Sequence, residues 1–187
     1  MNALLICGSR NPEGQTARAA GAVMKGLTKA GASTDQAFLP ELAIDRCRQC
    51  DERGWGTCRS EGQCVIEDDM AGLVEKMSKA DAVVFATPVY FSDLSESLRA
   101  LLDRLRRTCM NEAGKARVAG TPVFGVCVAG GGGGGAPECC VSLQRVLSTC
   151  GFTIADVVPI RRQNLETKLE QLETAGQWLA GEADTAP

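Results

Sequence analysis

The chain has 187 residues, with ten Cys, a single Tyr and no His. Without His, the chain cannot use Ser-His-Asp or Cys-His catalysis, and it cannot form a mixed Cys/His zinc site. Twenty basic against 23 acidic residues give a net charge of −3, which disfavours a sequence-independent nucleic-acid binder. With 44% hydrophobic residues the chain can bury a core of its own, so its cysteines are not needed as disulfide staples.

The N-terminal apolar run has no basic stretch before it, and no segment is apolar and long enough to be expected in a membrane. We therefore expect a cytoplasmic protein with no membrane partner and no nucleic-acid partner. In that compartment, clustered cysteines more often bind metal or carry out redox chemistry than form disulfides.

The first half of the chain alternates between predicted strands and helices. Residues 3–7 form a continuous apolar run typical of a buried strand, and residues 16–30 follow with helical spacing. Residues 34–39 alternate weakly, as expected of a strand nearer a sheet edge. Residues 68–79 predict a second helix, and residues 82–86 are the clearest buried strand.

The second half repeats this alternation. Residues 95–110 predict a helix with leucines on its inner face, and we expect its arginines to line a solvated face: Arg99, Arg104, Arg106 and Arg107. Residues 123–128 and 152–158 predict strands, each paired with a helix, at residues 138–149 and 165–179. The last residues, 181–187, have the composition of a frayed tail.

Five strand-helix repeats predict an α/β fold, a parallel sheet with right-handed crossovers and helices on both faces. We expect a single domain at residues 1–180, with a Cys-rich loop at residues 45–66. In such sheets ligands bind outside the carboxyl ends of the strands.

Three loops at those strand ends are candidates for ligand binding. Residues 8–16 (GSRNPEGQT) are polar and precede a helix, so they can surround a monophosphate; they lack the GK[ST] ending of a triphosphate loop. The alternative is an ordinary loop with Thr16 as the helix N-cap. Residues 87–92 (TPVYFS) place the only Tyr after the most apolar strand, which suits a flat heteroaromatic ligand, unless the aromatic side chains fold back onto the core. Residues 130–135 are all Gly, which suits close approach of backbone to a ligand, or else a linker.

Four cysteines lie within 18 residues: Cys47, Cys50, Cys58 and Cys64. Four thiolates can hold a tetrahedral metal ion or an iron–sulfur cluster. The alternatives are reduced cysteines without metal and a thioredoxin-like dithiol at the C-x-x-C pair. The other six are predicted to be core or near-core residues: Cys7, Cys109, Cys127, Cys139, Cys140 and Cys150.

These segments together resemble the iron–sulfur flavoproteins and the wider NADPH-dependent FMN reductase group of the flavodoxin-like superfamily. The likeness spans residues 4–135 and rests on the Cys-rich loop and two further stretches. GSRNPEGQT has the frame of that group's GSPR-x-x-GNT loop, and CVIEDDM followed by ADAVVFATPVYFSDLSESLRALLDRL matches its central stretch. One departure is that seven residues separate Cys50 from Cys58, where the iron–sulfur subgroup has a compact C-x2-C-x2-C.

The resemblance implies a flavodoxin-like three-layer sandwich with five parallel strands in the order 2-1-3-4-5. It implies FMN as cofactor, with a phosphate site, a ring site and a closing loop. The phosphate would be held by Ser9, Arg10, Asn11, Gln15 and Thr16. The ring would be flanked by Pro88, Val89, Tyr90 and Phe91, and closed off by Ala129, Gly130, Gly131 and Gly132.

The flavin would carry the chemistry, so no catalytic side chain is assigned. Electrons would come from NAD(P)H as co-substrate or from a ferredoxin-type donor, and pass to flavin, quinone, O2 or a protein. A [4Fe-4S] cluster on Cys47, Cys50, Cys58 and Cys64 would relay them. The resemblance also implies a homodimer or homotetramer. The alternatives are a reductase with free cysteines, a non-catalytic FMN electron carrier and a zinc-stabilised regulatory domain.

Overall fold

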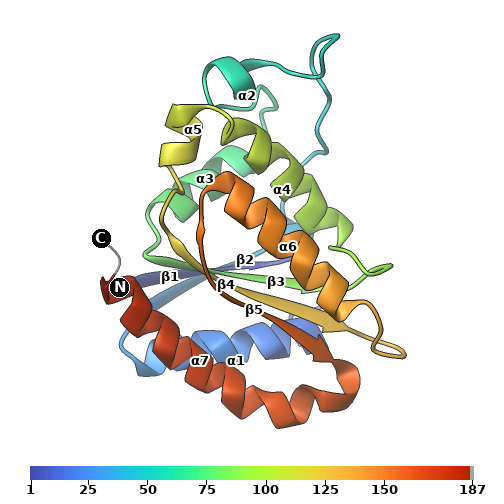
Figure 1. Cartoon of the computed structure of the whole chain (residues 1–187), viewed down its shortest axis with the longest axis vertical. Coiled ribbons are helices and arrows are strands. Elements are labelled where there is room, and N and C mark those ends of the chain that lie inside the picture. Colours follow the sequence, from blue (N-terminus) through green and yellow to red (C-terminus); the bar gives the residue numbers. More distant parts are fainter. Residues whose placement is uncertain (186–187) are drawn as a thin grey trace.

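A computed structural model describes residues 1–185, and side chains up to Gly181. Its centre is a sheet of five parallel strands in the order β2-β1-β3-β4-β5, as predicted (Figure 1). The strands are β1 (Asn2–Cys7), β2 (Ser33–Phe38), β3 (Ala82–Pro88), β4 (Pro122–Ala129) and β5 (Thr153–Arg161). The predicted edge position of the second strand is confirmed, because β2 pairs only with β1 among the described residues.

Helices cover both faces of this sheet and complete three layers (Figure 1). On one face lie α1 (Gln15–Lys29) and α7 (Leu165–Thr185), and on the other α3 (Met70–Ser78), α4 (Glu96–Thr108) and α6 (Ala136–Cys150). Each face has its own apolar core, which explains why β3 and β4 are apolar on both sides. Within residues 1–185, no helix is both long and apolar enough to cross a lipid bilayer.

All ten predicted strands and helices are present, and among the described residues two short α-helices were not predicted, α2 (Thr57–Ser60) and α5 (Glu112–Ala116). Helices this short contain too few residues to show an apolar period. The last helix is longer than predicted. It continues through Thr185 where a frayed tail was expected, and residues 186–187 lie outside the described residues.

Helices α1 and α7 cross with their backbones in close contact. A Cβ added at Gly26 would lie 2.0 Å from the carbonyl oxygen of Glu173, and one at Gly176 would lie 2.0 Å from that of Val23. Both positions therefore exclude any side chain.

Two predictions about side-chain position have opposite outcomes. The six cysteines outside the loop are all buried, as expected. The prediction that the arginines of α4 all face solvent is wrong for Arg104, whose side chain is 1% exposed and pairs with Asp68. Arg104 lies one helical turn from Leu101, at the margin of the apolar face, and turns inward because an acidic partner is buried there.

Candidate functional site

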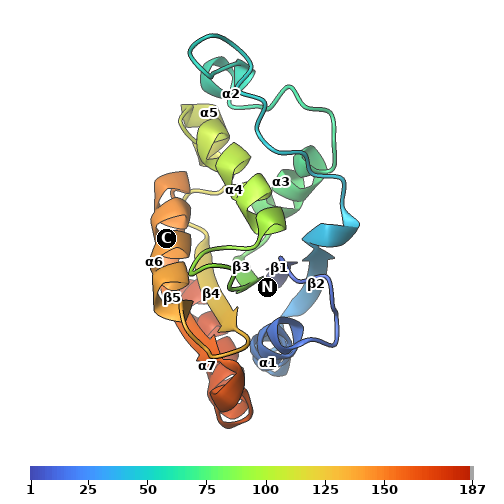
Figure 2. The ribbon, with the colours of Figure 1, turned by 90° about the vertical axis from the view of Figure 1, so that its right-hand side faces the viewer.

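A cleft of about 520 Å³ opens at the carboxyl ends of β1, β3 and β4, on the side that Figure 2 faces. It is lined by the three loops singled out in the sequence. Nine predicted residues line it: Asn11, Gln15, Thr16, Pro88, Val89, Tyr90, Ala129, Gly130 and Gly131. Ser9, Arg10, Phe91 and Gly132 were also predicted but do not line it, whereas Gly14, Val128 and Gly134 line it and were not predicted.

Helix α1 begins at this cleft without a side-chain cap. Its N-cap residue is Gly14, so the alternative that placed Thr16 at the N-cap is wrong. The first turn carries no acidic residue, and Gly14, Gln15 and Thr16 all line the cleft. The first N–H groups of a helix have no intrahelical partners and sit at the positive end of its dipole. The arrangement therefore suits an anion such as a phosphate.

The loop that leads into α1 is shaped by its own hydrogen bonds. The amide oxygen of Asn11 accepts from the N–H of Glu13 at 2.9 Å, and its carbonyl oxygen accepts from the N–H of Gly14 at 3.1 Å. The Ser9 hydroxyl accepts from the N–H of Asn11 at 3.3 Å. Ser9 and Asn11 thus hold the turn that brings Gly14 to the helix start.

Three hydroxyls that the sequence prediction missed tie the first two loops together. Thr87 Oγ1 accepts from the N–H of Ser95 at 3.0 Å, and the Ser97 hydroxyl donates to the carbonyl oxygen of Gly8 at 3.2 Å. A Cβ on Gly8 would lie 2.3 Å from Ser95 Oγ, so a side chain at this position would displace that hydroxyl. Ser95 also caps α4, and a serine at a helix start was the available signal.

The aromatic loop projects outward and does not fold onto the core. Tyr90 and Asp93 exchange two backbone hydrogen bonds of 2.9 Å, and between them Phe91 and Ser92 adopt positive φ angles of 49° and 63°. Non-glycine residues rarely adopt this conformation. Tyr90 is about half exposed and Phe91 fully exposed, so the alternative of core-packed aromatics is wrong.

The glycine loop is a hydrogen-bonded connection between β4 and α6, both of which pack in the same three-layer fold, and is not a linker. The N–H of Gly133 donates to the carbonyl oxygen of Gly130 at 2.8 Å, and Gln163 Nε2 donates to that of Gly131 at 2.9 Å. Gly135 has φ +81°, and a Cβ there would lie 2.5 Å from Ser92 Oγ. The loop therefore contacts the aromatic loop through backbone that only Gly allows.

The Cys-rich loop (residues 45–66) forms a second site, with α2, at the end of the molecule beside α4 and α5 (Figure 2). All four predicted thiols line one small cavity: Cys47, Cys50, Cys58 and Cys64. Among the described residues, no three His, Cys, Asp or Glu side chains lie close enough together to hold a metal ion. Four thiols around one cavity are the ligand type and number that an all-thiolate metal centre needs. Their sulfur atoms must move closer together before they can bind one metal ion or cluster.

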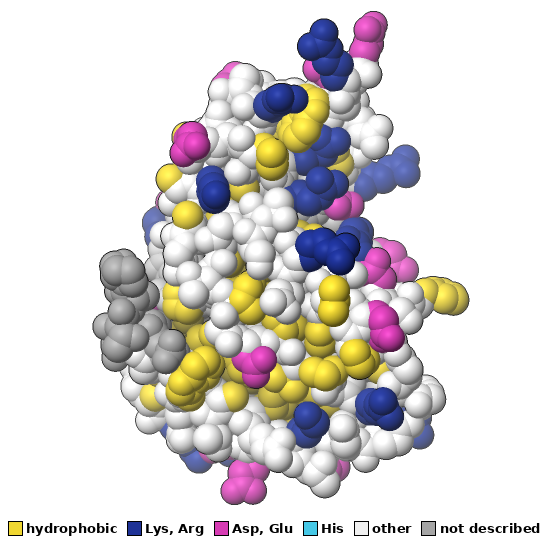
Figure 3. All heavy atoms as spheres, viewed as in Figure 1, with side chains coloured by type: hydrophobic (Ala, Val, Ile, Leu, Met, Phe, Trp, Pro, Cys, Tyr) yellow, Lys and Arg dark blue, Asp and Glu magenta, His cyan; other side chains and the backbone are white. Residues whose placement is uncertain are grey.

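Arginines surround this loop. Two guanidinium groups lie within cation–π distance of the Trp55 ring, that of Arg59 at 5.1 Å and that of Arg107 at 4.6 Å from the ring centroid. Figure 3 shows Lys and Arg side chains gathered at the end of the molecule where Figure 1 places α2. The exposed arginines within the Cys-rich loop are Arg46, Arg48, Arg53 and Arg59.

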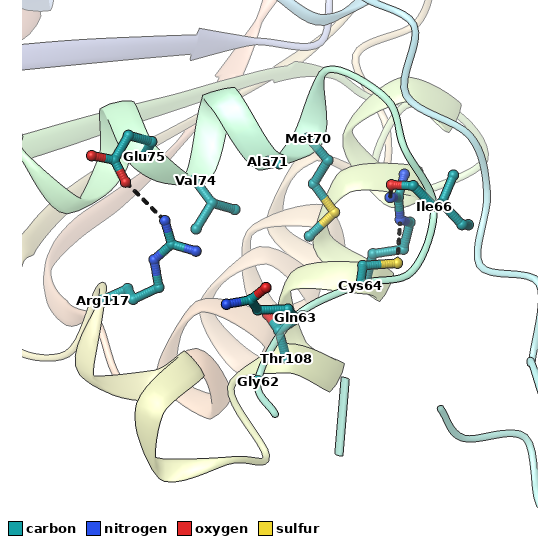
Figure 4. Close-up of a pocket in the computed structure, with 11 residues that line it drawn as sticks. Gly62, Gln63, Cys64, Ile66, Met70, Ala71, Val74, Glu75, Thr108 and Arg117 are labelled. Carbon is teal, nitrogen blue, oxygen red and sulfur yellow. Dashed lines mark hydrogen bonds and ion pairs between the residues drawn. The ribbon is translucent and has the colours of Figure 1, made fainter. Parts of the chain in front are cut away.

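The base of the loop is held by Arg104. Its Nη1 lies 2.5 Å from Asp68 Oδ2, its Nη2 lies 3.0 Å from Oδ1, and its Nε lies 3.4 Å from Cys64 Sγ. Burial opposes ionisation of Asp68, but hydrogen bonds from Arg104 and from two backbone N–H groups outweigh it and lower the pKa of this carboxyl. A neighbouring cavity of about 280 Å³ also borders Cys64, with an Arg117–Glu75 ion pair of 2.9 Å on its far side (Figure 4).

Comparison with known proteins places the chain in a family. Residues 1–162 match the family described as NADPH-dependent FMN reductase. The chain is 30% identical over 131 residues to an iron–sulfur flavoprotein of Methanocaldococcus jannaschii, covering 70% of this chain and 65% of that protein. It is 36% identical over 106 residues to an iron–sulfur flavoprotein of Methanosarcina thermophila, covering 54% and 53%. The chain thus spans about half to two thirds of the length of these relatives.

The fold has close counterparts among solved structures. An NAD(P)H:quinone oxidoreductase from Methanothermobacter marburgensis superposes with a TM-score of 0.67 at 20% identity, over 96% of each chain. At that identity the likeness shows the fold alone. The strand order observed here is the flavodoxin-like one. With the match over residues 1–162, the chain belongs to the NADPH-dependent FMN reductase family.

Proposed function

We propose that this protein is an FMN-dependent oxidoreductase whose cofactor binds in the cleft at the ends of β1, β3 and β4. The observation that carries this proposal is the uncapped start of α1, which opens into a cleft of about 520 Å³. That volume lies within the roughly 300–1,000 Å³ of small-molecule sites. Family membership supports FMN as the ligand.

Each loop has a distinct part in this proposal. The N–H groups at the start of α1, with the side chains of Gln15 and Thr16, hold the phosphate. Pro88, Val89 and Tyr90 border the flavin ring on one side. Gly130 and Gly131 border it on the other, where the absence of side chains lets the backbone approach the ring.

When bound, FMN supplies the capacity to accept a hydride or single electrons, and the protein positions it and controls access. A reaction carried out by the flavin does not need a histidine as acid or base, and this chain has none. We propose NAD(P)H or a ferredoxin-type protein as electron donor, and flavin, quinone, O2 or a redox protein as acceptor. The family description and the quinone oxidoreductase of the same fold support the first donor.

For the four loop thiols we propose a [4Fe-4S] cluster. Its support is that all four line one cavity and that the relatives aligned with this chain are named iron–sulfur flavoproteins. We further propose a homodimer or homotetramer, supported by Phe91, which stands fully exposed beside the cleft.

Anaerobic reconstitution tests these proposals separately. Apoprotein titrated with FMN should quench the flavin fluorescence at one FMN per chain, and NADPH should then bleach the flavin absorbance. Protein that leaves FMN fluorescence unchanged would overturn the flavin site. Weak NADPH oxidation with fast reduction by ferredoxin would identify an electron carrier. Iron and sulfide analysis tests the cluster, and flavin absorbance without iron would leave a reductase with free cysteines.

A further inference from the structure

Arg104 is the most deeply buried charged residue described, and its guanidinium uses its full donor capacity. Arginine has five N–H donors in a fixed planar fork. The structure gives five contacts: two to the carboxylate of Asp68, two to backbone carbonyls and one to sulfur. A side chain used so completely is held in a single orientation.

The two backbone contacts join the two ends of the Cys-rich loop. Nη1 donates to the carbonyl oxygen of Asp45 at 3.0 Å, and Nη2 donates to that of Ile66 at 3.4 Å. Asp68 strengthens the same closure, because its Oδ2 accepts from the N–H of Asp45 at 2.9 Å. The segment that carries the four cysteines therefore begins and ends on one buried ion pair.

The fifth contact reaches a candidate ligand directly. Nε of Arg104 donates to Cys64 Sγ at 3.4 Å, and Figure 4 shows this contact beside Ile66. Arg104 also lines the cavity shared by all four thiols. Cys64 is thus fixed by a rigid donor on α4.

We propose that Arg104 is the positioning residue of the thiol site: it closes the base of the Cys-rich loop and fixes the sulfur of Cys64, toward which the other three thiols must move to bind metal. This inference rests on the proposed metal-binding function of the loop. A donor to a ligating sulfur orients it, and loss of such outer contacts commonly lowers metal affinity about 10–100-fold. Hydrogen bonds to cluster sulfurs also set the reduction potential.

The test variant must remove Arg104 without leaving a buried charge. R104M alone would leave the Asp68 carboxylate buried and unpaired, so the double variant R104M/D68N is used. Its Asn keeps one acceptor oxygen, which can replace Oδ2 toward the N–H of Asp45, so the bond that Oδ1 accepts from the N–H of Met70 is lost. The matched control is R106M on the same helix, because Arg106 pairs only with Asp103 in the described structure.

Metal affinity is measured on metal-free protein with Cd²⁺ as the probe, from the thiolate-to-metal absorbance. We expect wild type and R106M to bind equally, and R104M/D68N to bind at least tenfold more weakly with unchanged circular dichroism and FMN affinity. Equal Cd²⁺ affinity in all three proteins would overturn the role of Arg104 and leave the metal site standing. Wild type that takes up neither Cd²⁺ nor iron would overturn both, while the FMN titration still reports on the flavin site.

A second readout separates positioning from general support of the fold. The ion pair is removed as a neutral unit, so no net charge changes, and Cys64 loses its N–H donor together with the two carbonyl contacts that close the loop. Redox titration of the reconstituted proteins should then give a more negative cluster potential in R104M/D68N than in R106M. An unshifted potential would contradict the proposed contact with the ligating sulfur.

Discussion

Adding one methyl group at Gly26 is expected to force helices α1 and α7 apart. The Cβ of Ala would lie 2.0 Å from the backbone oxygen of Glu173, while real Cβ contacts are essentially never shorter than 3.0 Å. The obstacle is backbone and cannot rotate away, so the helices must separate locally by about 1 Å. A gap of that size forfeits a quarter to a half of the dispersion energy of the contacts it opens.

The expected size of this effect follows from two opposing contributions. Overpacking a well-packed contact costs about 1–3 kcal/mol, and the upper end applies where the backbone must move. Replacing Gly by Ala in a helix returns about 1 kcal/mol. G26A should therefore lower the free energy of unfolding by about 2 kcal/mol, which is roughly 4–8 °C in Tm for a chain of this length.

Gly21 on the same helix provides the matched control, because a Cβ there meets no atom within 4 Å. G21A should stabilise the protein by about 1 kcal/mol through helix propensity alone. Urea unfolding followed by circular dichroism measures both variants. The double variant G26A/G176A should cost less than the sum of its single variants, because both methyls need the same separation. G26A that proves as stable as G21A would refute the reasoning.

Flavin binding, acid stability and thiol reactivity give further tests. G130A should weaken FMN binding about tenfold, or roughly 1.4 kcal/mol, in fluorescence titration. The control is G132A, which should bind FMN normally, because Gly132 does not line the cleft and a Cβ there, as at Gly130, meets no atom within 4 Å. Equal FMN affinities of the two variants would contradict a close approach of the loop to the flavin. The lowered pKa of Asp68 means that its carboxylate stabilises the folded state at pH values above its ordinary pKa of 3.8, and this contribution is lost as the pH falls through the pKa in the folded protein. The free energy of unfolding should therefore fall less steeply with acid in R104M/D68N than in wild type. Parallel curves of stability against pH would contradict this prediction. Iodoacetamide should label the exposed Cys50 fastest and the six buried cysteines only on unfolding, and native labelling of Cys127, seen by peptide mapping, would contradict the burial.

The fold could be predicted because its signal is periodic and repeated. Runs such as residues 82–86 are apolar on both faces since helices cover both sides of the sheet, and five such repeats leave few topologies. The position of the cleft followed from the same logic, as ligands bind where parallel strands end.

What the sequence did not predict depends on contacts between distant residues. The partner of Arg104 is Asp68, 36 positions away, and nothing local to α4 distinguishes this arginine from the half-buried Arg106. The hydrogen bond from the Ser97 hydroxyl to the carbonyl oxygen of Gly8 joins residues 89 positions apart. The positive φ angle of Phe91 has no signal in residue type, because an aromatic residue is not expected there.

The closure of the Cys-rich loop at its base bears on how freely its length can vary. Arg104 and Asp68 hold Asp45 and Ile66 together whatever lies between them. Lengthening a loop that is already closed adds little entropy cost, about 0.6 kcal/mol for each doubling. Insertions between Cys50 and Cys58 should therefore be tolerated by the fold, and a longer gap between these two cysteines does not by itself open the base of the loop.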